Sequence, residues 1–331
     1  MQYSGSGLAI TGCGSAVPAA SLDNHTLSQI VETSDEWIAT RTGIRSRHVA
    51  SPQETLVDLA VEASKGAIAT ANINPEDLDL IILATSTPDE LFGTAGKIQY
   101  ELGAKRAVAF DLTAACSGFV FGLVTAAQFI RTGVYKNVLL IGADILSRWV
   151  DWSDRRTCIL FGDGAGAVVL QANEPDRLLG FMLQSDGEKH DQLNLAYQPE
   201  AKLLANLTIG QGGFAPITMN GQEIYRFAVK RVPEVLEKAL FHAHCTTDDI
   251  DWLILHQANQ RILDAVAQRM KISAEKVVSN MAQHGNTSAA SIPLALDAEV
   301  RQGKIKVGDK VAIAGFGAGL SWGAAIFTWG R

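Results

Sequence analysis

The sequence contains one pattern twice, and this internal repeat restricts the possible folds more than any other feature. The segment DLDLIILAT, which begins at Asp77, aligns without a gap to DIDWLILHQ, which begins at Asp249, at an offset of 172 residues (249 − 77). Residues 107–133 align to residues 277–303 at an offset of 170 (277 − 107). Two nearly equal offsets indicate two copies of one structural unit. We therefore expect two equivalent halves, residues 1–172 and 173–331, related by a pseudo-twofold axis.

Each half alternates apolar, strand-like runs with segments of helical length. The runs are LAITGCG, LDLIILATST, NVLLIGAD, AGAVVLQ, WLILHQA and KVAIAGFG. This alternation is typical of sheets with parallel strands that are flanked by helices. With 47% hydrophobic and 19% charged residues, the chain has the composition of a compact globular protein. The sequence therefore predicts the α/β class.

Charge and cysteine content exclude several functions. A net charge of −7 argues against a nucleic-acid partner, which needs an excess of clustered Lys and Arg. We expect no membrane span, because no run approaches the roughly 18 uninterrupted apolar residues that a spanning helix needs. We also expect no signal peptide and therefore a cytoplasmic location. The four cysteines are widely spaced without a C-x-x-C pattern, which predicts reduced thiols and no metal site. We expect Cys13, Cys158 and Cys245 to be structural.

Cys116 differs from the other cysteines in its position. It lies in DLTAACSGFVFGL, where a strand ending at Asp111 turns into residues 119–130, which are apolar on all faces. Such a helix must be buried, and its first turn directs unpaired N–H groups and the positive end of the helix dipole toward the thiol. We therefore expect a pKa below the free value of about 8.5. Cys116 is a candidate nucleophile, and an inert buried cysteine is the alternative.

His256 and Asn286 are candidates for the same site. Among seven histidines, His256 alone closes an apolar run at the carboxyl end of a strand, where ligands bind in open α/β sheets; capping of the next helix is the alternative. Asn286, in QHGNTSAASIP, could be an ordinary helix N-cap. The gapless alignment, however, places Asn286 on Cys116 and His256 on Ala84. We therefore expect Cys, His and Asn side chains to converge between the halves.

The glycine-rich segment GFGAGLSWG, Gly315 to Gly323, follows the last long apolar run. Its glycines permit a tight turn and close approach of the backbone to a ligand. Dinucleotide binding is not indicated, because the G-x-G-x-x-G order and a following helix are both missing. The segment is better suited to an oxyanion-binding turn.

Taken together, these motifs resemble the thiolase-fold condensing enzymes, and in particular the β-ketoacyl-acyl carrier protein synthase III family. The segments that carry the resemblance span the chain in the family's order: TSDEWIATRTGIRSRH, DLTAACSGF, FGDGAGA, LHQANQRI, HGNTSAASIP and GFGAGLSWG. The resemblance implies a thiolase-like fold with αβαβα layers, and an acyltransferase that initiates type II fatty acid synthesis without a cofactor or metal. Cys116 would accept the acyl group, and His256 and Asn286 would bind the malonyl thioester. Backbone groups of Cys116 and of the turn Gly317–Ala318–Gly319 would form the oxyanion hole.

The same resemblance implies the substrates and their binding residues. An acyl-coenzyme A (acyl-CoA), such as acetyl-CoA, would be the primer, and malonyl-acyl carrier protein (malonyl-ACP) would be the donor. The residues implied for CoA are Trp37, Arg41, Arg155, Gly221 and Gln222; those for the carrier protein are Arg226, Gln257 and Arg261. Phe92 would cross the interface of a homodimer and close the partner's acyl pocket.

Some features depart from the family or leave alternatives open. Arg156 stands where some members have a small residue, and Trp152 competes with Trp37 for the adenine clamp. A polyketide-type or 3-hydroxy-3-methylglutaryl-type condensing enzyme would also carry Cys, His and Asn. A cysteine hydrolase with Cys116 as nucleophile and His256 as base is the second alternative, and a non-catalytic acyl-binding relative is the third.

Overall fold

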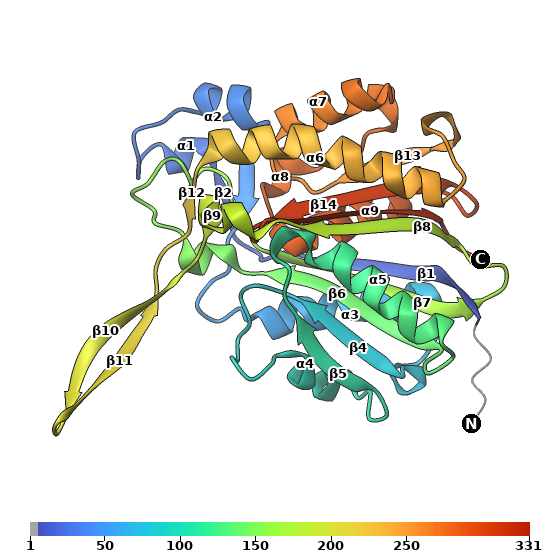
Figure 1. The fold of residues 1–331 in the computed structure, drawn as a ribbon, viewed down its shortest axis with the longest axis horizontal. Helices are drawn as coiled ribbons and strands as arrows, with labels where there is room; N and C mark the ends of the chain where they lie inside the picture. The colour runs from blue at the N-terminus through green and yellow to red at the C-terminus, as the bar shows by residue number, and fades with distance from the viewer. Residues whose placement is uncertain (1–5) are drawn as a thin grey trace.

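The computed structural model describes residues 6–331, which form two stacked β-sheets with helices between them and on both outer faces (Figure 1). The first sheet holds, in spatial order, β1 (Gly7–Ala16), β7 (Gly164–Asn173), β6 (Asn137–Asp144), β4 (Leu80–Ala84) and β5 (Val108–Leu112). The second sheet holds β8 (Leu178–Ser185), β15 (Ser321–Thr328), β14 (Lys310–Gly317) and β13 (Trp252–Leu255). Each sheet therefore draws its strands from one of the two predicted halves.

The two sheets have the same strand order and directions. In the first, β1, β7 and β6 pair antiparallel, and β6, β4 and β5 pair parallel. In the second, β8, β15 and β14 pair antiparallel, and β14 and β13 pair parallel. The counterpart of β5 is reduced to a parallel bridge between Leu253 and Val277. The strands thus repeat as the sequence predicted, while the domain boundary near residue 173 stays a prediction.

The helices occupy three layers, which gives the αβαβα order. Between the sheets lie α5 (Gly118–Arg131) and α9 (Ser291–Arg301); α3 (Leu56–Ala71) and α4 (Ala95–Leu102) cover the first sheet, and α6 (Gly221–His242) and α7 (Gln260–Met270) cover the second (Figure 1). The predicted apolar helix is α5, whose only charged residue, Arg131, ends it. Its placement between two sheets explains why it carries no polar face.

The layers join the two halves into one core. Helix α9 belongs to the second half but packs against β1 and β7 of the first half as well as against β13. One hydrophobic cluster of buried side chains accordingly contains residues from both halves, such as Leu140 of β6 and Ile313 of β14. Neither half buries its apolar surface alone.

The structure corrects the gapless alignment of the halves. Each middle helix is preceded by a 3₁₀ turn, Ala115–Ser117 before α5 and Ser288–Ala290 before α9. Each turn begins with a residue of positive φ, Ala115 at 48° and Ser288 at 52°. The structural equivalent of Cys116 is therefore Ala289, not Asn286. The helices end in register, but α9 has 11 residues and α5 has 14, so a gapless alignment places the helix starts three positions out of register.

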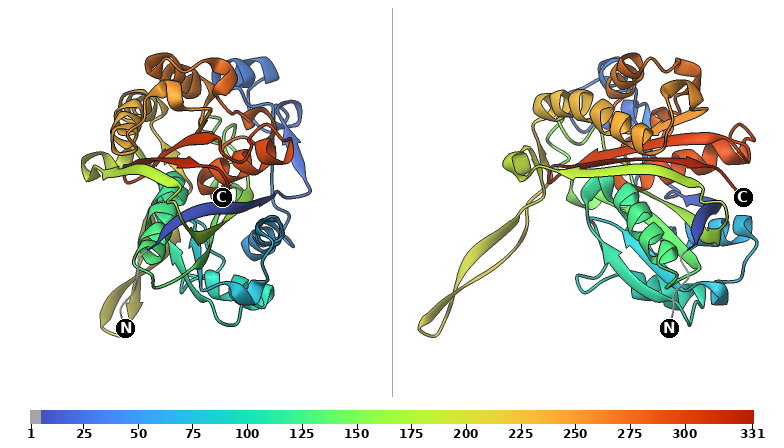
Figure 2. Two further views of the ribbon diagram at one scale, coloured as in Figure 1. Left: turned by 90° about the vertical axis from the view of Figure 1, so that its right-hand side faces the viewer. Right: turned by 45° about the vertical axis from the view of Figure 1, so that its right-hand side comes forward.

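Two additions extend beyond the sheets on the side of the carboxyl ends of the parallel strands. The first contains β2 (Ser21–Asp23), α1 (Asn24–Leu27), α2 (Asp35–Thr42) and β3 (Ser46–His48). The second contains β9 (Leu193–Asn194), β10 (Tyr197–Leu204), β11 (Leu207–Phe214) and β12 (Thr218–Met219). The β10–β11 hairpin projects from the body (Figures 1 and 2). A short helix, α8 (Met281–His284), packs against β3.

Residues 6–331 contain neither a membrane-spanning helix nor a cluster of metal ligands. None of the helices there is long and apolar enough to cross a membrane. No group of three or more His, Cys, Asp or Glu side chains there is arranged to hold a metal ion.

Candidate active site

Cys116 lies at the junction between β5 and α5. The chain leaves β5 at Leu112 and turns through Ala115, whose positive φ directs the next residue toward the second half of the molecule. The Cys116 sulfur accepts a hydrogen bond from Ser288 Oγ at 3.3 Å, and the residue is only 7% exposed. It lines a cavity of about 1430 Å³. The cysteine thus reaches a cavity while remaining shielded from bulk water.

The expectation of a lowered Cys116 pKa is wrong. Burial raises the pKa of the Cys116 thiol to about 12, with a smaller upward effect from Asp144. The hydrogen bond from Ser288 acts in the opposite direction. Desolvation outweighs the local N–H groups and the helix dipole, because the thiolate loses its hydration shell. The sequence pattern showed the helix but not the depth of the sulfur.

The glycine-rich segment forms the turn between β14 and β15, directly beside the cysteine. A Cβ added to Gly317 would lie 2.7 Å from the Cys116 backbone nitrogen, so only glycine permits this approach. Ser321 Oγ is 2.8 Å from Ser117 Oγ and donates to Ala318 O at 3.0 Å. These contacts hold the turn against the residues around Cys116, as an oxyanion-binding role requires.

His256 directly follows β13, as the sequence predicted. Its ring Nδ1 is 2.8 Å from Ser291 Oγ, and its ring packs edge-on against Phe316 at a centroid distance of 5.1 Å. It does not cap the next helix, because Asn259 does so by accepting a hydrogen bond from Arg261 N. His256 is 1% exposed, and burial lowers its pKa to about 3. The imidazole is therefore neutral at physiological pH.

The hydrogen bonds of Ser291 are compatible with the Nε2–H tautomer of His256. The backbone N–H of Gln257 points at Ser291 Oγ at 3.3 Å, so the oxygen accepts there. Its hydroxyl proton can be donated to His256 Nδ1. With that donation the ring proton lies on Nε2, and the histidine presents a neutral N–H donor.

Asn286 begins the turn that meets Cys116. Its backbone N–H donates to Leu160 O at 2.8 Å, and its side-chain Oδ1 accepts from Ser288 N at 2.9 Å. It is not the N-cap of α9, since that position is Ala290. With Oδ1 engaged, the amide retains Nδ2 as a donor. Asn286 is 6% exposed.

Hydrogen bonds join Asn286 to Cys116 through Ser288, while His256 is held by residues that adjoin the same turns. Asn286 bonds to Ser288, and Ser288 bonds to Cys116. His256 is held by Ser291, at the start of α9, and by Phe316, next to the turn that abuts Cys116. His256 and Asn286 are buried and do not line the cavity that Cys116 reaches. Strands and helices of both halves thus supply one site.

The residues predicted to clamp the adenine of CoA are also adjacent. The Arg41 guanidinium lies 4.4 Å from the centroid of the Trp37 ring, and that of Arg155 lies 5.3 Å from it. Arg155 also donates to Glu32 O at 3.1 Å. Arg156 is instead paired with Asp154, at 2.9 Å. The arginine that departs from the family pattern is therefore engaged outside the Trp37 stack.

The residues predicted to bind the rest of CoA and the carrier protein have different environments. Gly221 and Gln222 are exposed at the start of α6. Arg226 is exposed and pairs with Glu223 at 2.8 Å, and Arg261 donates to Thr40 O at 3.2 Å. These four residues are accessible to a ligand.

Gln257 is a correction to the sequence analysis. Its side chain is fully buried, and its amide donates to Leu255 O at 2.7 Å and to Val278 O at 3.2 Å. Its Oε1 accepts from Asn280 N at 3.1 Å. A side chain with these internal bonds cannot form part of a docking surface, so Gln257 joins β13 to the following segments instead.

Phe92 lies on the loop between β4 and α4 and is fully exposed in the single chain. Leu91 beside it is 81% exposed. Both line the same cavity as Cys116, close to β5, the edge strand of the first sheet.

Comparison with known proteins places this arrangement in a family. Residues 110–187 match the family described as 3-oxoacyl-[acyl-carrier-protein (ACP)] synthase III, and residues 240–329 match its C-terminal part. A β-ketoacyl-[acyl-carrier-protein] synthase III of Acaryochloris marina is 70% identical over 332 residues, covering 100% of both chains. One of Nostoc sp. is 72% identical over 326 residues, covering 98% of this chain and 99% of the relative. The chain belongs to the β-ketoacyl-ACP synthase III family.

Solved structures of synthase III proteins share the fold. The synthase III of Aquifex aeolicus is 43% identical, with a TM-score of 0.90 and coverage of 98% of this chain and 100% of that one. The priming β-ketosynthase of the R1128 polyketide pathway is 32% identical, with a TM-score of 0.91 and coverage of 99% and 98%. The predicted thiolase-like α/β fold and the assignment to acyltransferase condensing enzymes are confirmed.

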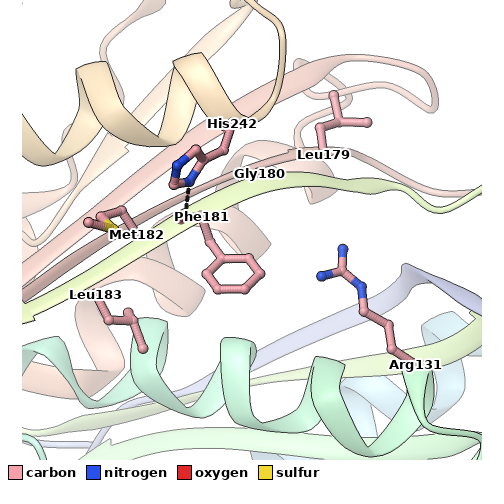
Figure 3. A pocket seen from close by; sticks show the side chains of 7 residues that line it. All are labelled: Arg131, Leu179, Gly180, Phe181, Met182, Leu183 and His242. Carbon is pink, nitrogen blue, oxygen red and sulfur yellow. Dashed lines mark hydrogen bonds between the residues drawn. The ribbon is translucent and has the colours of Figure 1, made fainter.

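A separate pocket of about 540 Å³ lies away from the candidate active site, between the end of α5 and β8 (Figure 3). Its polar groups are already bonded: Arg131 to Asp176 at 2.8 Å, and His242 Nδ1 to Phe181 O at 3.0 Å. None of the predicted site residues lines it.

Four polar residues that hold the candidate site together do not stand out in the sequence: Asp144, Ser288, Ser291 and Ser321. The serines at 288 and 291 lie in the quoted motif HGNTSAASIP, two and five positions after Asn286. Their roles depend on the strained turn before α9, and serine carries no signal for a positive φ.

Proposed function

We propose that this chain condenses an acyl-CoA primer with malonyl-ACP, through an acyl group carried on Cys116, to give 3-ketoacyl-ACP, CoA and CO₂. The observation that carries the proposal is the position of Cys116. Its sulfur meets the turn of Asn286 and Ser288, and its backbone nitrogen meets Gly317. Family membership supports the same reaction.

In the first half-reaction, the Cys116 thiol loses its proton and its sulfur attacks the thioester carbonyl of the primer. The carbon–sulfur bond to CoA then breaks, and CoA takes up a proton and leaves as the thiol. The carbonyl oxygen gains negative charge as the tetrahedral intermediate forms. Backbone N–H groups at Cys116 and in the turn Gly317–Ala318 are the proposed donors to that oxygen. The close approach of Gly317 to Cys116 supports this role.

In the second half-reaction, malonyl-ACP loses CO₂, and the resulting enolate attacks the acyl group. Loss of CO₂ creates the carbanion without removal of a proton, so the site needs donors rather than a base. Nε2–H of neutral His256 and Nδ2 of Asn286 are the proposed donors to the enolate oxygen. The low pKa of His256 supports this role, because a neutral imidazole donates without adding a buried charge.

We propose that CoA enters along the surface marked by Trp37. Stacking of the adenine on Trp37 and Arg155 would use the cation–π geometry already present, and Arg41 would meet the phosphates. Gly221 and Gln222 are proposed contacts at the start of α6. The apolar wall of the cavity, including Leu193, Phe214 and Ile217, is suited to the pantetheine arm and a short acyl group.

Arg226 and Arg261 are the proposed docking residues for the carrier protein. Acyl carrier proteins are acidic, and this chain carries a net charge of −7, so docking requires a local basic surface. Both arginines are exposed, on α6 and α7 of the same outer layer.

We also propose a homodimer in which Phe92 closes the partner's acyl pocket. Leu91 and Phe92 are exposed beside β5, an edge strand whose Val108 is 50% exposed. Apolar side chains beside an unpaired strand edge favour association.

The four unpaired cysteines are compatible with a reducing compartment, and we propose the cytoplasm.

The experiment is a single-turnover assay with chain that has been acylated by acetyl-CoA and freed of excess substrate. Malonyl-ACP is expected to discharge the acyl group and yield acetoacetyl-ACP, whereas buffer alone leaves the acyl group in place. Rapid discharge in buffer alone would favour a cysteine hydrolase. A strong preference for malonyl-CoA over malonyl-ACP would favour another type of condensing enzyme.

A further inference from the structure

Ser288 has a backbone conformation that its residue type rarely adopts. Its φ of 52° lies in the left-handed region, where Gly, Asn and Asp are the usual residues. The residue is 2% exposed and begins the 3₁₀ turn before α9. Strained residues of this kind persist only where the surrounding contacts impose them, and they gather at functional sites.

The strain directs the Ser288 hydroxyl at the reacting atom. Ser288 Oγ donates to Cys116 Sγ at 3.3 Å, across the boundary between the two halves. The backbone N–H of the same residue donates to Asn286 Oδ1 at 2.9 Å. Ser288 therefore joins two of the proposed catalytic side chains.

Asp144 lies behind this turn and is fully buried at the end of β6. Its Oδ1 accepts from Thr85 Oγ1 at 3.1 Å, Ser86 N at 2.8 Å and Thr87 Oγ1 at 3.0 Å. Its Oδ2 accepts from Ala289 N at 3.3 Å. The carboxylate thus ties the loop after β4 to the residue that follows Ser288.

Close packing of the backbones restricts the same turn from β6. A Cβ added to Gly142 would lie 2.2 Å from Ala289 O, which leaves no room for a side chain. The turn is therefore held at two points of β6, Gly142 and Asp144. It has little freedom to move Ser288 away from Cys116.

We propose that Ser288 is a further catalytic residue, whose hydroxyl stabilises negative charge on the Cys116 sulfur, and that Asp144 is the residue that positions it. The inference rests on the proposed role of Cys116. The sulfur carries negative charge twice in that reaction: before it attacks the primer and when it leaves after condensation. A thiolate in a buried site needs a donor close to it, and Ser288 is the side-chain donor that contacts it.

The first test measures alkylation of Cys116 by iodoacetamide at pH 8, well below its midpoint, where the rate is proportional to the thiolate fraction. Loss of a hydrogen bond to a charged group should slow alkylation in Ser288→Ala about ten- to a hundredfold. Ser64→Ala is the matched control: it also removes a buried serine hydroxyl, but Ser64 Oγ bonds only Ala60 O on α3. It should alkylate like the unaltered chain.

Ser288→Gly separates the hydroxyl from the backbone. Glycine tolerates the left-handed conformation, so this variant relieves strain while it removes the donor. The proposal expects Ser288→Gly to be as slow as Ser288→Ala. If Ser288→Gly alkylates like the unaltered chain, the serine has only a backbone role and the proposal is overturned. Melting temperatures identify any variant that fails to fold, and the remaining variant then decides.

Asp144→Asn tests the positioning role by the sign of its effect. The charge of Asp144 raises the pKa of Cys116, so removal of the charge alone would speed alkylation. If Asp144 acts by holding the Ser288 turn, Asp144→Asn slows alkylation instead. In a Ser288→Ala background, where only the effect of the charge remains, Asp144→Asn should no longer slow alkylation. Unchanged or faster alkylation would overturn the role given to Asp144.

Acylation by acetyl-CoA distinguishes failure of the proposed function from failure of the proposal about Ser288. If the unaltered chain forms no acyl-Cys116 with acetyl-CoA, the proposed function fails. If it forms that intermediate and both Ser288 variants match it in alkylation and in the rate of acylation, only the inference about Ser288 fails.

Discussion

At the scale of single residues, burial determines which protonation states the site can use. Burial raises the pKa of Cys116 to about 12 and lowers that of His256 to about 3, because each group loses the hydration of its charged form. The same environment therefore favours a neutral histidine donor and makes the thiolate depend on nearby donors. Sequence reasoning identified both residues by their positions after strands, but depth within the fold is not visible in a local pattern.

The role of His256 predicts a selective defect. In His256→Gln, acylation of Cys116 should stay within a few fold, while condensation with malonyl-ACP should fall about 10²- to 10³-fold, because one donor to the enolate is lost. Mass spectrometry of the acyl-enzyme and the yield of acetoacetyl-ACP measure the two steps. His244→Asn, in an exposed left-handed position, is the control. Equal loss of both steps would contradict the assignment.

His256 also predicts a pH dependence of stability. Its pKa is about 3 when folded and about 6.5 when unfolded, so between these values the unfolded state binds the proton and stability falls as the pH falls. Relative to His256→Gln, the unaltered chain should lose about 2 kcal/mol of unfolding free energy between pH 7 and pH 5. His284, whose pKa is also lowered by burial, is present in both proteins and cancels. Urea denaturation of both proteins at pH 7 and pH 5 measures these free energies. An equal loss of unfolding free energy in the two proteins would contradict the prediction.

At the scale of elements, the site depends on two turns that meet at the boundary of the halves. One turn leads from β5 into α5 and carries Cys116; the other leads into α9 and carries Ser288. The β14–β15 turn packs against the first through Gly317. Both turns precede a helix that lies between the two sheets, so each half contributes an equivalent turn to the site.

Gly317→Ala tests how closely these turns must approach. The added Cβ would lie 2.7 Å from the Cys116 nitrogen, and the displaced backbone should lower the rate of acylation by at least about 10²-fold. Gly187→Ala is the control, because a Cβ there meets nothing within 4 Å. Stopped-flow release of CoA gives the acylation rate. A normal rate in folded Gly317→Ala would contradict the oxyanion-hole assignment.

The elements also show where sequence reasoning works. The repeat at offset 172 correctly aligned β4 with β13, because the two strands have similar lengths and align without a gap. The apolar character of α5 correctly predicted its burial. The gapless alignment failed at Asn286 because α9 is shorter than α5. The assignment of Gln257 to carrier-protein binding, which the family resemblance implied, failed because a polar residue after a strand can bond inward as well as outward.

At the scale of the whole molecule, two faces carry the remaining proposals. The face with α6 and α7 presents Arg226 and Arg261, and the edge of the first sheet presents Leu91 and Phe92. Neither a docking surface nor a dimer interface leaves a periodic signal in one sequence, because exposed arginines and loop aromatics also occur without partners. These predictions came from the family resemblance.

Arg261→Glu tests the docking face. Reversal of a charge opposite an acidic carrier protein should raise the KM for malonyl-ACP about tenfold and leave acylation by acetyl-CoA unchanged. Lys105→Glu makes the same change of charge on an exposed residue near α4, in the opposite outer layer, and should change neither. Steady-state kinetics at low ionic strength provide the readout, and an unchanged KM would remove Arg261 from the docking surface.

The central claim is that Cys116 carries the acyl group. After the chain is mixed with acetyl-CoA, intact-protein mass spectrometry should show a gain of one acetyl group, mapped by proteolysis to the peptide that contains Cys116. Cys116→Ala should show no gain. An unmodified chain, or an acetyl group mapped to a different residue, would contradict the account.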